Sequence, residues 1–173
     1  MIRLERLGPG HAEEILAGQD EALAREIIGR PWDRESLEEF LDRCARWRED
    51  GPVQELAAID GPTGQLLGGG GLNRLTPDLE AGQVALTYWL LAESRGRGLG
   101  AVLARALADR ARALPPARGM ALRAAVLLIA PDNGPSQAVA RSLGARPTGE
   151  QVPHPTGGVR VAEKWVLDLR VGA

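Results

Sequence analysis

The stretch whose residue types point most directly to chemistry is ESRGRGLG, Glu93 to Gly100. It combines three glycines with Arg95 and Arg97, and it lies between an apolar run and an amphipathic one. Glycine lets the backbone approach an anion closely, and the first turn of a following helix presents unpaired N–H groups at the positive end of its dipole. Arginine adds forked donors that suit phosphate oxygens. This stretch therefore predicts a phosphate-binding loop.

The same letters could also belong to a flexible linker or to an arginine–glycine tail that binds nucleic acid. A linker would separate independent units, whereas the flanking residues have the pattern of one strand followed by one helix. An arginine–glycine tail would be repetitive, and this motif occurs once. A P-loop requires Gly-Lys-Ser/Thr, and a dinucleotide-binding turn requires G-x-G-x-x-G. The stretch has no lysine, and the spacing of Gly96, Gly98 and Gly100 is two and two, so neither loop fits.

Hydrophobic periodicity indicates the elements that position this loop. Period-two alternation or a short apolar run indicates a strand, and apolar residues at three- and four-residue spacing indicate a helix. The run at 83–91 is apolar on both faces, so we expect a fully buried strand there. The four glycines at 68–71 are interpreted as part of a strand, softened or bulged. We expect strands at 2–7, 53–59, 65–75, 83–91, 121–130, 144–150 and 159–169, and helices at 11–28 with a break near Gly18, 33–47, 99–114 and 135–143.

Composition limits the class of protein and its partners. We find no internal repeat and no dividing linker, so residues 1–173 are expected to form a single mixed α/β domain. The net charge of −2 argues against nucleic acid and anionic membrane as partners. No run approaches the roughly 20 apolar residues of a membrane span, and the N-terminus lacks the layout of a signal peptide. A single cysteine, Cys44, excludes an internal disulfide, so we expect a cytoplasmic protein.

Two motifs at a defined separation carry a resemblance to a known family. The pattern Arg-x-x-Gly-x-Gly is met by Arg95, Gly98 and Gly100, after TYWLLAES and before an amphipathic helix. About 35 residues later, APDNGPSQAVARSLGA places Asn133 three residues before Ser136, ahead of a helix that ends in Leu-Gly. Together with the element order, these motifs resemble the GNAT superfamily of N-acetyltransferases. They are most similar to the bacterial RimJ/RimL-type branch, the ribosomal-protein N-terminal acetyltransferases.

The resemblance implies a fold and a co-substrate. The fold would be a central, mostly antiparallel twisted sheet of about seven strands with a V-shaped splay, flanked by helices. Acetyl-CoA would be the co-substrate, without a metal. Asn133 would contact the pantetheine arm and Ser136 would lie near the sulfur. Backbone groups would bind the rest, the pantetheine and thioester at Leu90, Leu91 and Ala92, and the pyrophosphate at Arg95, Gly96, Arg97, Gly98, Leu99 and Gly100.

The resemblance leaves the catalytic residues open. An attacking amine must lose a proton, and the thiolate leaving group benefits from a nearby hydroxyl. The family's tyrosine for that second role matches Ala140 here, and Tyr88, the only tyrosine, is expected to be a core aromatic. Ser136 is then the candidate hydroxyl, although it could instead cap the helix. The glutamate of the branch matches Ala85, so the remaining candidates for the base are Glu80 and His154.

Three functions therefore compete. The first is an acetyltransferase that acts on an amine acceptor, either a small molecule or a protein N-terminus. The second is a non-catalytic acyl-CoA-binding or sensing module that kept the fold and lost the base. The third, an RNA-binding protein that uses Arg95 and Arg97, is disfavoured by the charge and by the scarcity of aromatic residues. A homodimer through the final strands is a further expectation.

Overall fold

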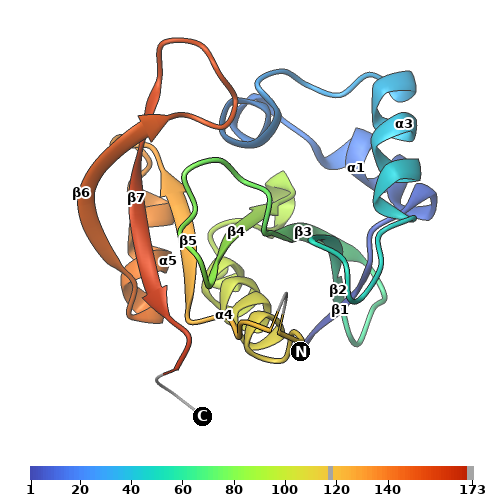
Figure 1. The fold of residues 1–173 in the computed structure, drawn as a ribbon. Coiled ribbons are helices and arrows are strands. Elements are labelled where there is room, and N and C mark those ends of the chain that lie inside the picture. The colour runs from blue at the N-terminus through green and yellow to red at the C-terminus, as the bar shows by residue number, and fades with distance from the viewer. Residues whose placement is uncertain (117–118, 171–173) are drawn as a thin grey trace.

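A twisted sheet forms the centre of the protein. The computed structural model describes residues 1–116 and 119–170, and in that part of the chain seven strands follow the order β1-β2-β3-β4-β5-β7-β6 (Figure 1). Neighbouring strands are antiparallel except β4 and β5, which run parallel. The expected mostly antiparallel sheet is confirmed. The strands are β1 (Ile2–Arg6), β2 (Val53–Asp60), β3 (Leu66–Asn73), β4 (Gln83–Leu90), β5 (Ala124–Ile129), β6 (Arg146–Pro153) and β7 (Val161–Asp168).

The parallel pair separates along its length. The pairing of β4 with β5 covers three positions, from Gln83 opposite Ala124 to Ala85 opposite Val126. Beyond Ala85 the two strands diverge, which is the V-shaped splay expected from the resemblance. The expectation that residues 83–91 form a fully buried strand is wrong for the second half, where Thr87 is exposed. A run of apolar residues does not show where a strand stops pairing with the next strand of the sheet.

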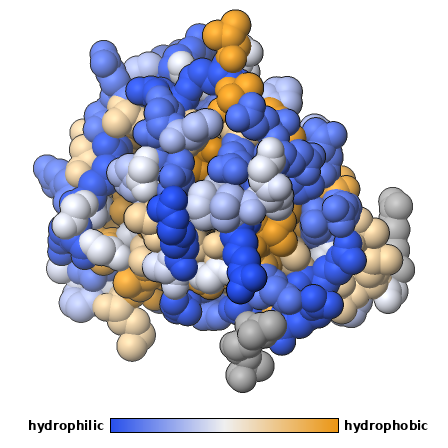
Figure 2. Space-filling model, turned by 90° about the vertical axis from the view of Figure 1, so that its left-hand side faces the viewer, coloured by the Kyte–Doolittle hydropathy of each residue, from blue (hydrophilic) through white to orange (hydrophobic). Residues whose placement is uncertain are grey.

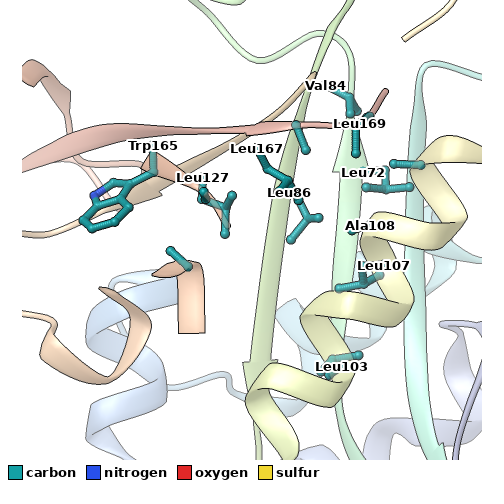
Figure 3. Packing of buried hydrophobic residues seen from close by; sticks show 14 of the residues in the cluster. Leu72, Val84, Leu86, Leu103, Leu107, Ala108, Leu127, Trp165, Leu167 and Leu169 are labelled. Carbon is teal, nitrogen blue, oxygen red and sulfur yellow. The ribbon is translucent and has the colours of Figure 1, made fainter. Parts of the chain in front are cut away.

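Helices cover both faces of the sheet (Figure 1). Alternate residues of β2 point to opposite faces, and they belong to two separate apolar clusters. Leu56 belongs to the cluster that includes residues of α4 and α5, part of which Figure 3 shows, whereas Ala57 belongs to the cluster that includes residues of α1 and α3. The helices are α1 (Ala12–Gly18), α2 (Glu21–Leu23), a π-helical segment (Ala24–Ile28), α3 (Arg34–Cys44), α4 (Leu99–Arg112) and α5 (Gly134–Leu143), with short 3-10 turns at Pro9–His11 and Ala92–Ser94.

The observed element boundaries have local causes. The break near Gly18 is confirmed: α1 ends there, and Asp20 starts α2 by accepting a 2.9 Å hydrogen bond from the Leu23 amide. The helix expected at 33–47 ends at Cys44, and Trp47 turns back to donate its indole N–H to the Glu55 carbonyl at 2.9 Å. The strand expected at 144–150 begins two residues later, because left-handed Gly144 still ends α5.

β3 contains the glycine run 68–71 because neighbouring groups occupy the space of its side chains. A Cβ atom on Gly69 would lie 2.6 Å from the indole ring of Trp89, and one on Gly71 would lie 2.6 Å from a carboxylate oxygen of Glu55. The register of β2 against β3 also shifts once, as in a β-bulge. The interpretation as a bulged strand is confirmed. Because Gly69 and Gly71 have no side chains, the side chains of Trp89 and Glu55 can lie over β3 at these positions.

Candidate active site

The loop from Arg95 to Gly100 joins the open end of β4 to the start of α4. Gly96 and Gly98 have φ values of 72° and 73°, a left-handed conformation that favours glycine. Within the described residues, the amides of Gly96, Arg97 and Gly98 donate no hydrogen bond. Gly98 is the N-cap of α4, so the unpaired N–H groups of the first helical turn lie beside these amides. The loop therefore has the geometry of an anion-binding site.

The two arginines of the loop have different surroundings. Arg95 makes a bidentate ion pair with Asp20, with both N–O distances 2.7 Å, and also donates to the Leu90 carbonyl at 3.1 and 3.2 Å. The Arg95 hydrogen bond holds the pKa of Asp20 below its usual range. Arg97 is exposed. The Arg95 side chain thus connects the loop to α2, and the Arg97 side chain is the one that faces solvent.

The end of β4 presents backbone groups to the splay. Leu91 donates its amide to the Leu67 carbonyl of β3 at 3.0 Å, and Ala92 accepts from the Arg95 amide at 3.3 Å. Backbone groups of successive strand residues point in opposite directions. Leu90 and Tyr88 therefore direct their N–H and C=O groups away from β3, into the splay. Of the three residues that the resemblance implies here, Leu90 directs its amide into the splay, whereas the Leu91 amide is bonded to β3.

A pair of hydroxyl groups bridges the splay. The Tyr88 hydroxyl of β4 donates to the Ser136 hydroxyl of α5 at 3.2 Å. Asn133 is the N-cap of α5 and accepts from the Ser136 amide at 3.2 Å. The cap alternative for Ser136 is therefore wrong, because Asn133 provides the cap and the Ser136 hydroxyl is free for another role. Burial raises the pKa of Tyr88, so its hydroxyl stays protonated at neutral pH.

Glu80 lies away from this centre. It precedes β4 at the end where β4 and β5 are still paired, and the splay opens at the opposite end. Its carboxylate pairs with Arg123 at 2.7 Å, and both side chains are at least half exposed. Glu80 is therefore part of a surface ion pair and is not placed to take a proton from an amine in the splay.

His154 is buried in the loop between β6 and β7. Its Nδ1 lies 2.6 Å from the Thr156 hydroxyl, and its Nε2 lies 3.5 Å from the Glu26 carboxylate. Arg160 pairs with the same Glu26 and with Asp132. Burial lowers the pKa of His154. These contacts hold the loop against the π-helical segment (Figure 1), and both ring nitrogens of His154 are engaged within them.

The residues around the splay fit the co-substrate that the resemblance implies. The loop amides suit a pyrophosphate, and the Tyr88 backbone groups and the Leu90 amide suit an amide-containing arm, since the Leu90 carbonyl already accepts from Arg95. Gly100 lies close to the side chains beside the splay: a Cβ atom there would contact Val139 and Tyr88 at 3.4 and 3.6 Å. In the described residues, no three His, Cys, Asp or Glu side chains are grouped as metal ligands.

Sequence reasoning misses two residues of this site. The apolar run favours Tyr88 as a core residue, and only the splay exposes its hydroxyl. Asp20 has a sequence signal, a capping residue after the break at Gly18, but nothing in the sequence pairs it with Arg95.

None of the described helices is both long and apolar enough to cross a membrane.

Solved structures of known proteins share this fold. Spermidine N-acetyltransferase from Vibrio cholerae, in complex with CoA and spermine, superposes with a TM-score of 0.76 at 16% identity, over 98% of this chain and 96% of that one. A GNAT-family acetyltransferase from Bacillus anthracis gives 0.75 at 13% identity, over 98% and 95%. A putative ribosomal-protein-serine acetyltransferase from Vibrio cholerae gives 0.71 at 20% identity, over 96% and 93%.

Sequence comparison identifies the family. A search of curated proteins found no match to the chain. The family described as "Acetyltransferase (GNAT) domain" matches residues 2–146, which include the loop at 95–100 and the Asn133–Ser136 motif. The match covers most of the chain, so this protein belongs to the GNAT acetyltransferase family.

Proposed function

We propose that this protein transfers the acetyl group of acetyl-CoA to a primary amine by direct attack. The observation that carries the proposal is the splay itself, with the unpaired loop amides of residues 96–98 at one end and the Tyr88–Ser136 hydroxyl pair across it. Acetyl-CoA, when bound, supplies the activated acetyl group as a thioester. The protein supplies binding, orientation and proton transfer.

Each part of the splay has a role in this reaction. The amides of Gly96 to Gly98 and the first turn of α4 bind the pyrophosphate. Asn133 uses its amide oxygen to cap α5, which leaves its amide NH2 group for the pantetheine arm. The backbone N–H groups of Tyr88 and Leu90 stabilise negative charge that develops on the thioester oxygen.

As the amine nitrogen bonds to the thioester carbon, the C–S bond breaks, the amine loses its proton to water, and the hydroxyl pair provides a proton for the leaving thiolate. Tyr88 donates its hydrogen to Ser136, so the Ser136 hydroxyl keeps its own hydrogen to donate into the splay. The raised pKa of Tyr88 keeps the Tyr88 hydroxyl protonated at neutral pH, so it can donate to Ser136. This arrangement provides the function of the family's tyrosine at a different position, since Ala140 occupies that position and is fully buried.

A non-catalytic acyl-CoA sensor is the second candidate. The observation that favours it is Ala85, which stands where the related branch has a glutamate, together with the surface pairing of Glu80. The hydroxyl pair favours the enzyme, because a sensor requires no proton donor beside the sulfur.

Two finer assignments are part of the proposal. Assignment to the RimJ/RimL-type branch is supported by the NGPS motif and by the fold shared with the putative ribosomal-protein-serine acetyltransferase. A homodimer is supported by the position of β6, an exposed strand at the edge of the sheet. Figure 2 shows that this side of the molecule is mainly hydrophilic, so dimerisation there would depend on strand pairing.

The test is incubation of the protein with acetyl-CoA and a panel of peptides with free N-termini, polyamines, aminoglycosides and amino acids. Release of free thiol that depends on the amine, with the acetylated amine seen by mass spectrometry, supports the enzyme. Binding of acetyl-CoA without thiol release across the panel supports the sensor. Absence of heat stabilisation by millimolar coenzyme A contradicts both.

A further inference from the structure

Glu55 is a carboxylate that the mechanism above does not use. It lies on β2 and points to the sheet face covered by α3, since it alternates with Gln54 and Leu56, of which Gln54 contacts Arg110 of α4. Its carboxyl group extends over Gly71 of β3, within 2.6 and 2.7 Å of where a Cβ atom would be. Gly71 is therefore the residue that permits this side-chain position.

The same carboxylate borders a cavity of about 480 Å³ between α3 and the start of β2. The cavity has aromatic and aliphatic walls and arginines among its lining residues. Such a space accommodates the body of a small organic molecule. The lining residues other than Glu55 are Phe40, Arg43, Cys44, Arg46, Trp47, Arg48, Gly51, Pro52 and Val53.

No cation in the described structure pairs with the Glu55 carboxylate. Arg48 pairs with Asp50 at 2.9 Å, Arg46 donates to the Asp42 carbonyl at 3.0 Å, and Arg43 lies 6.0 Å from the centre of the Phe40 ring. The thiol of Cys44 is neutral, because burial raises its pKa to about 12. Burial likewise raises the pKa of Glu55 to about 7. Glu55 is half-buried. Removing a carboxylate from water without a partner is costly, and a bound ammonium group would offset that cost.

The carboxylate also lies close to the splay. Gly71 pairs with Thr87 of β4, and Thr87 is exposed on the part of β4 that has already left β5. The side chains of Thr87 and Glu55 belong to the same face of the sheet, opposite the face that carries α4 and Tyr88. An amine held by Glu55 would therefore approach β4 from the face opposite α4, whose N-terminus receives the pyrophosphate.

We infer that Glu55 binds the ammonium group of the acceptor and that the acceptor is a primary amine on an apolar body. This inference rests on the proposed function and names the substrate class of that site. The walls of the cavity, Phe40 and Trp47, receive the apolar body. Glu55 is the one carboxylate among the lining residues, beside Arg43, Arg46 and Arg48, so the cavity pairs with one ammonium group and gives a second one no anionic partner. The site therefore disfavours polyamines.

Binding of 2-phenylethylamine and of spermidine to the CoA-saturated protein, measured by calorimetry, tests the inference. We expect 2-phenylethylamine to bind at least tenfold more tightly than spermidine. The substitution Glu55→Gln keeps the shape and removes the charge, and it should weaken 2-phenylethylamine binding by about ten- to hundredfold, the usual loss for a charged hydrogen bond. Glu39→Gln, on the exposed side of α3, is the matched control and should bind like the wild type.

The outcomes separate this inference from the function on which it rests. Failure of the wild type to bind coenzyme A overturns the proposed function. Normal coenzyme A binding with no 2-phenylethylamine binding, with tighter spermidine binding, or with equal 2-phenylethylamine affinity in wild type and Glu55→Gln overturns the inference alone. Coenzyme A affinity of the Glu55→Gln variant, which should be unchanged, verifies that it is folded.

Discussion

The two sides of the splay differ in the groups they offer to a ligand: backbone amides on one side and side chains on the other. On the proposed donor side, the loop 95–100 and β4 offer backbone amides, and their geometry depends on glycines with positive φ and on one helix start. On the acceptor side, the candidate groups are side chains: the Glu55 carboxylate and the walls of the adjoining cavity. Backbone recognition requires glycine at fixed spacing and so leaves a motif in the sequence. Side-chain recognition can draw residues from any strand or helix and leaves none.

The largest expected effect concerns the donor side. Gly98→Val forces a β-branched residue into the left-handed conformation and moves the amides that we propose bind the pyrophosphate. Loss of one or two hydrogen bonds to a charged group should weaken coenzyme A binding by on the order of 10²- to 10⁴-fold in calorimetry. Gly144→Val is the matched control, because Gly144 also has a positive φ, at the end of α5. Equal coenzyme A affinity in the two variants would contradict the role of the loop.

The next effect concerns proton donation. Ser136→Ala removes the hydroxyl that faces the sulfur in the proposed reaction and should lower kcat by about a hundredfold, the low end for general acid catalysis, because a thiolate is already a fair leaving group. Tyr88→Phe leaves Ser136 in place and should have a smaller effect. Single-turnover rates at saturating acetyl-CoA measure both. A larger loss for Tyr88→Phe than for Ser136→Ala would make Tyr88 the direct donor.

How far the sequence predicts this molecule follows from the same contrast. The loop, the Asn133–Ser136 motif and the order of the elements are predictable, because periodicity and glycine spacing record backbone geometry. The splay is implied only by the resemblance. The exposure of Thr87 and of the Tyr88 hydroxyl could not be predicted, because a run of apolar residues does not show where a neighbouring strand diverges. Glu55 could not be found, since its position depends on a missing side chain at Gly71 in another strand.

The third prediction concerns the Glu55 carboxyl group, whose raised pKa should make the free energy of unfolding depend on pH. The pKa of Glu55 rises from 4.5 to about 7 on folding, so between these values the folded state holds a proton that the unfolded state has lost. The contribution of Glu55 to stability is therefore greatest below pH 4.5 and falls as the pH rises toward 7. Because the side chain is partly exposed, we expect the free energy of unfolding of the wild type, relative to Glu55→Gln, to fall by roughly 1–2 kcal/mol between pH 5 and pH 8. Denaturant titration at both pH values measures it, and a constant difference would show that the carboxylate is solvated.

The smallest effect concerns the ion pair between Arg95 of the loop and Asp20 at the start of α2. Arg95 belongs to the donor loop, and Asp20 caps α2, which leads into the π-helical segment that contacts the β6–β7 loop. Asp20→Asn keeps an acceptor for the Leu23 amide and removes the charge. Both partners are about one-third exposed, so the pair should contribute about 1 kcal/mol to the free energy of unfolding.

A double-mutant cycle of Asp20→Asn with Arg95→Gln, followed by denaturant titration, isolates this contribution from the cap and from the Arg95 bond to the Leu90 carbonyl. The same cycle read out as coenzyme A affinity distinguishes two roles for Arg95. If its guanidinium only positions the loop, Asp20→Asn weakens coenzyme A binding slightly, because the loop loses its support. If the guanidinium instead binds phosphate directly, release from Asp20 strengthens coenzyme A binding. Tighter coenzyme A binding in Asp20→Asn would thus show that Arg95 binds phosphate directly, whereas weaker binding would show that it supports the loop from α2.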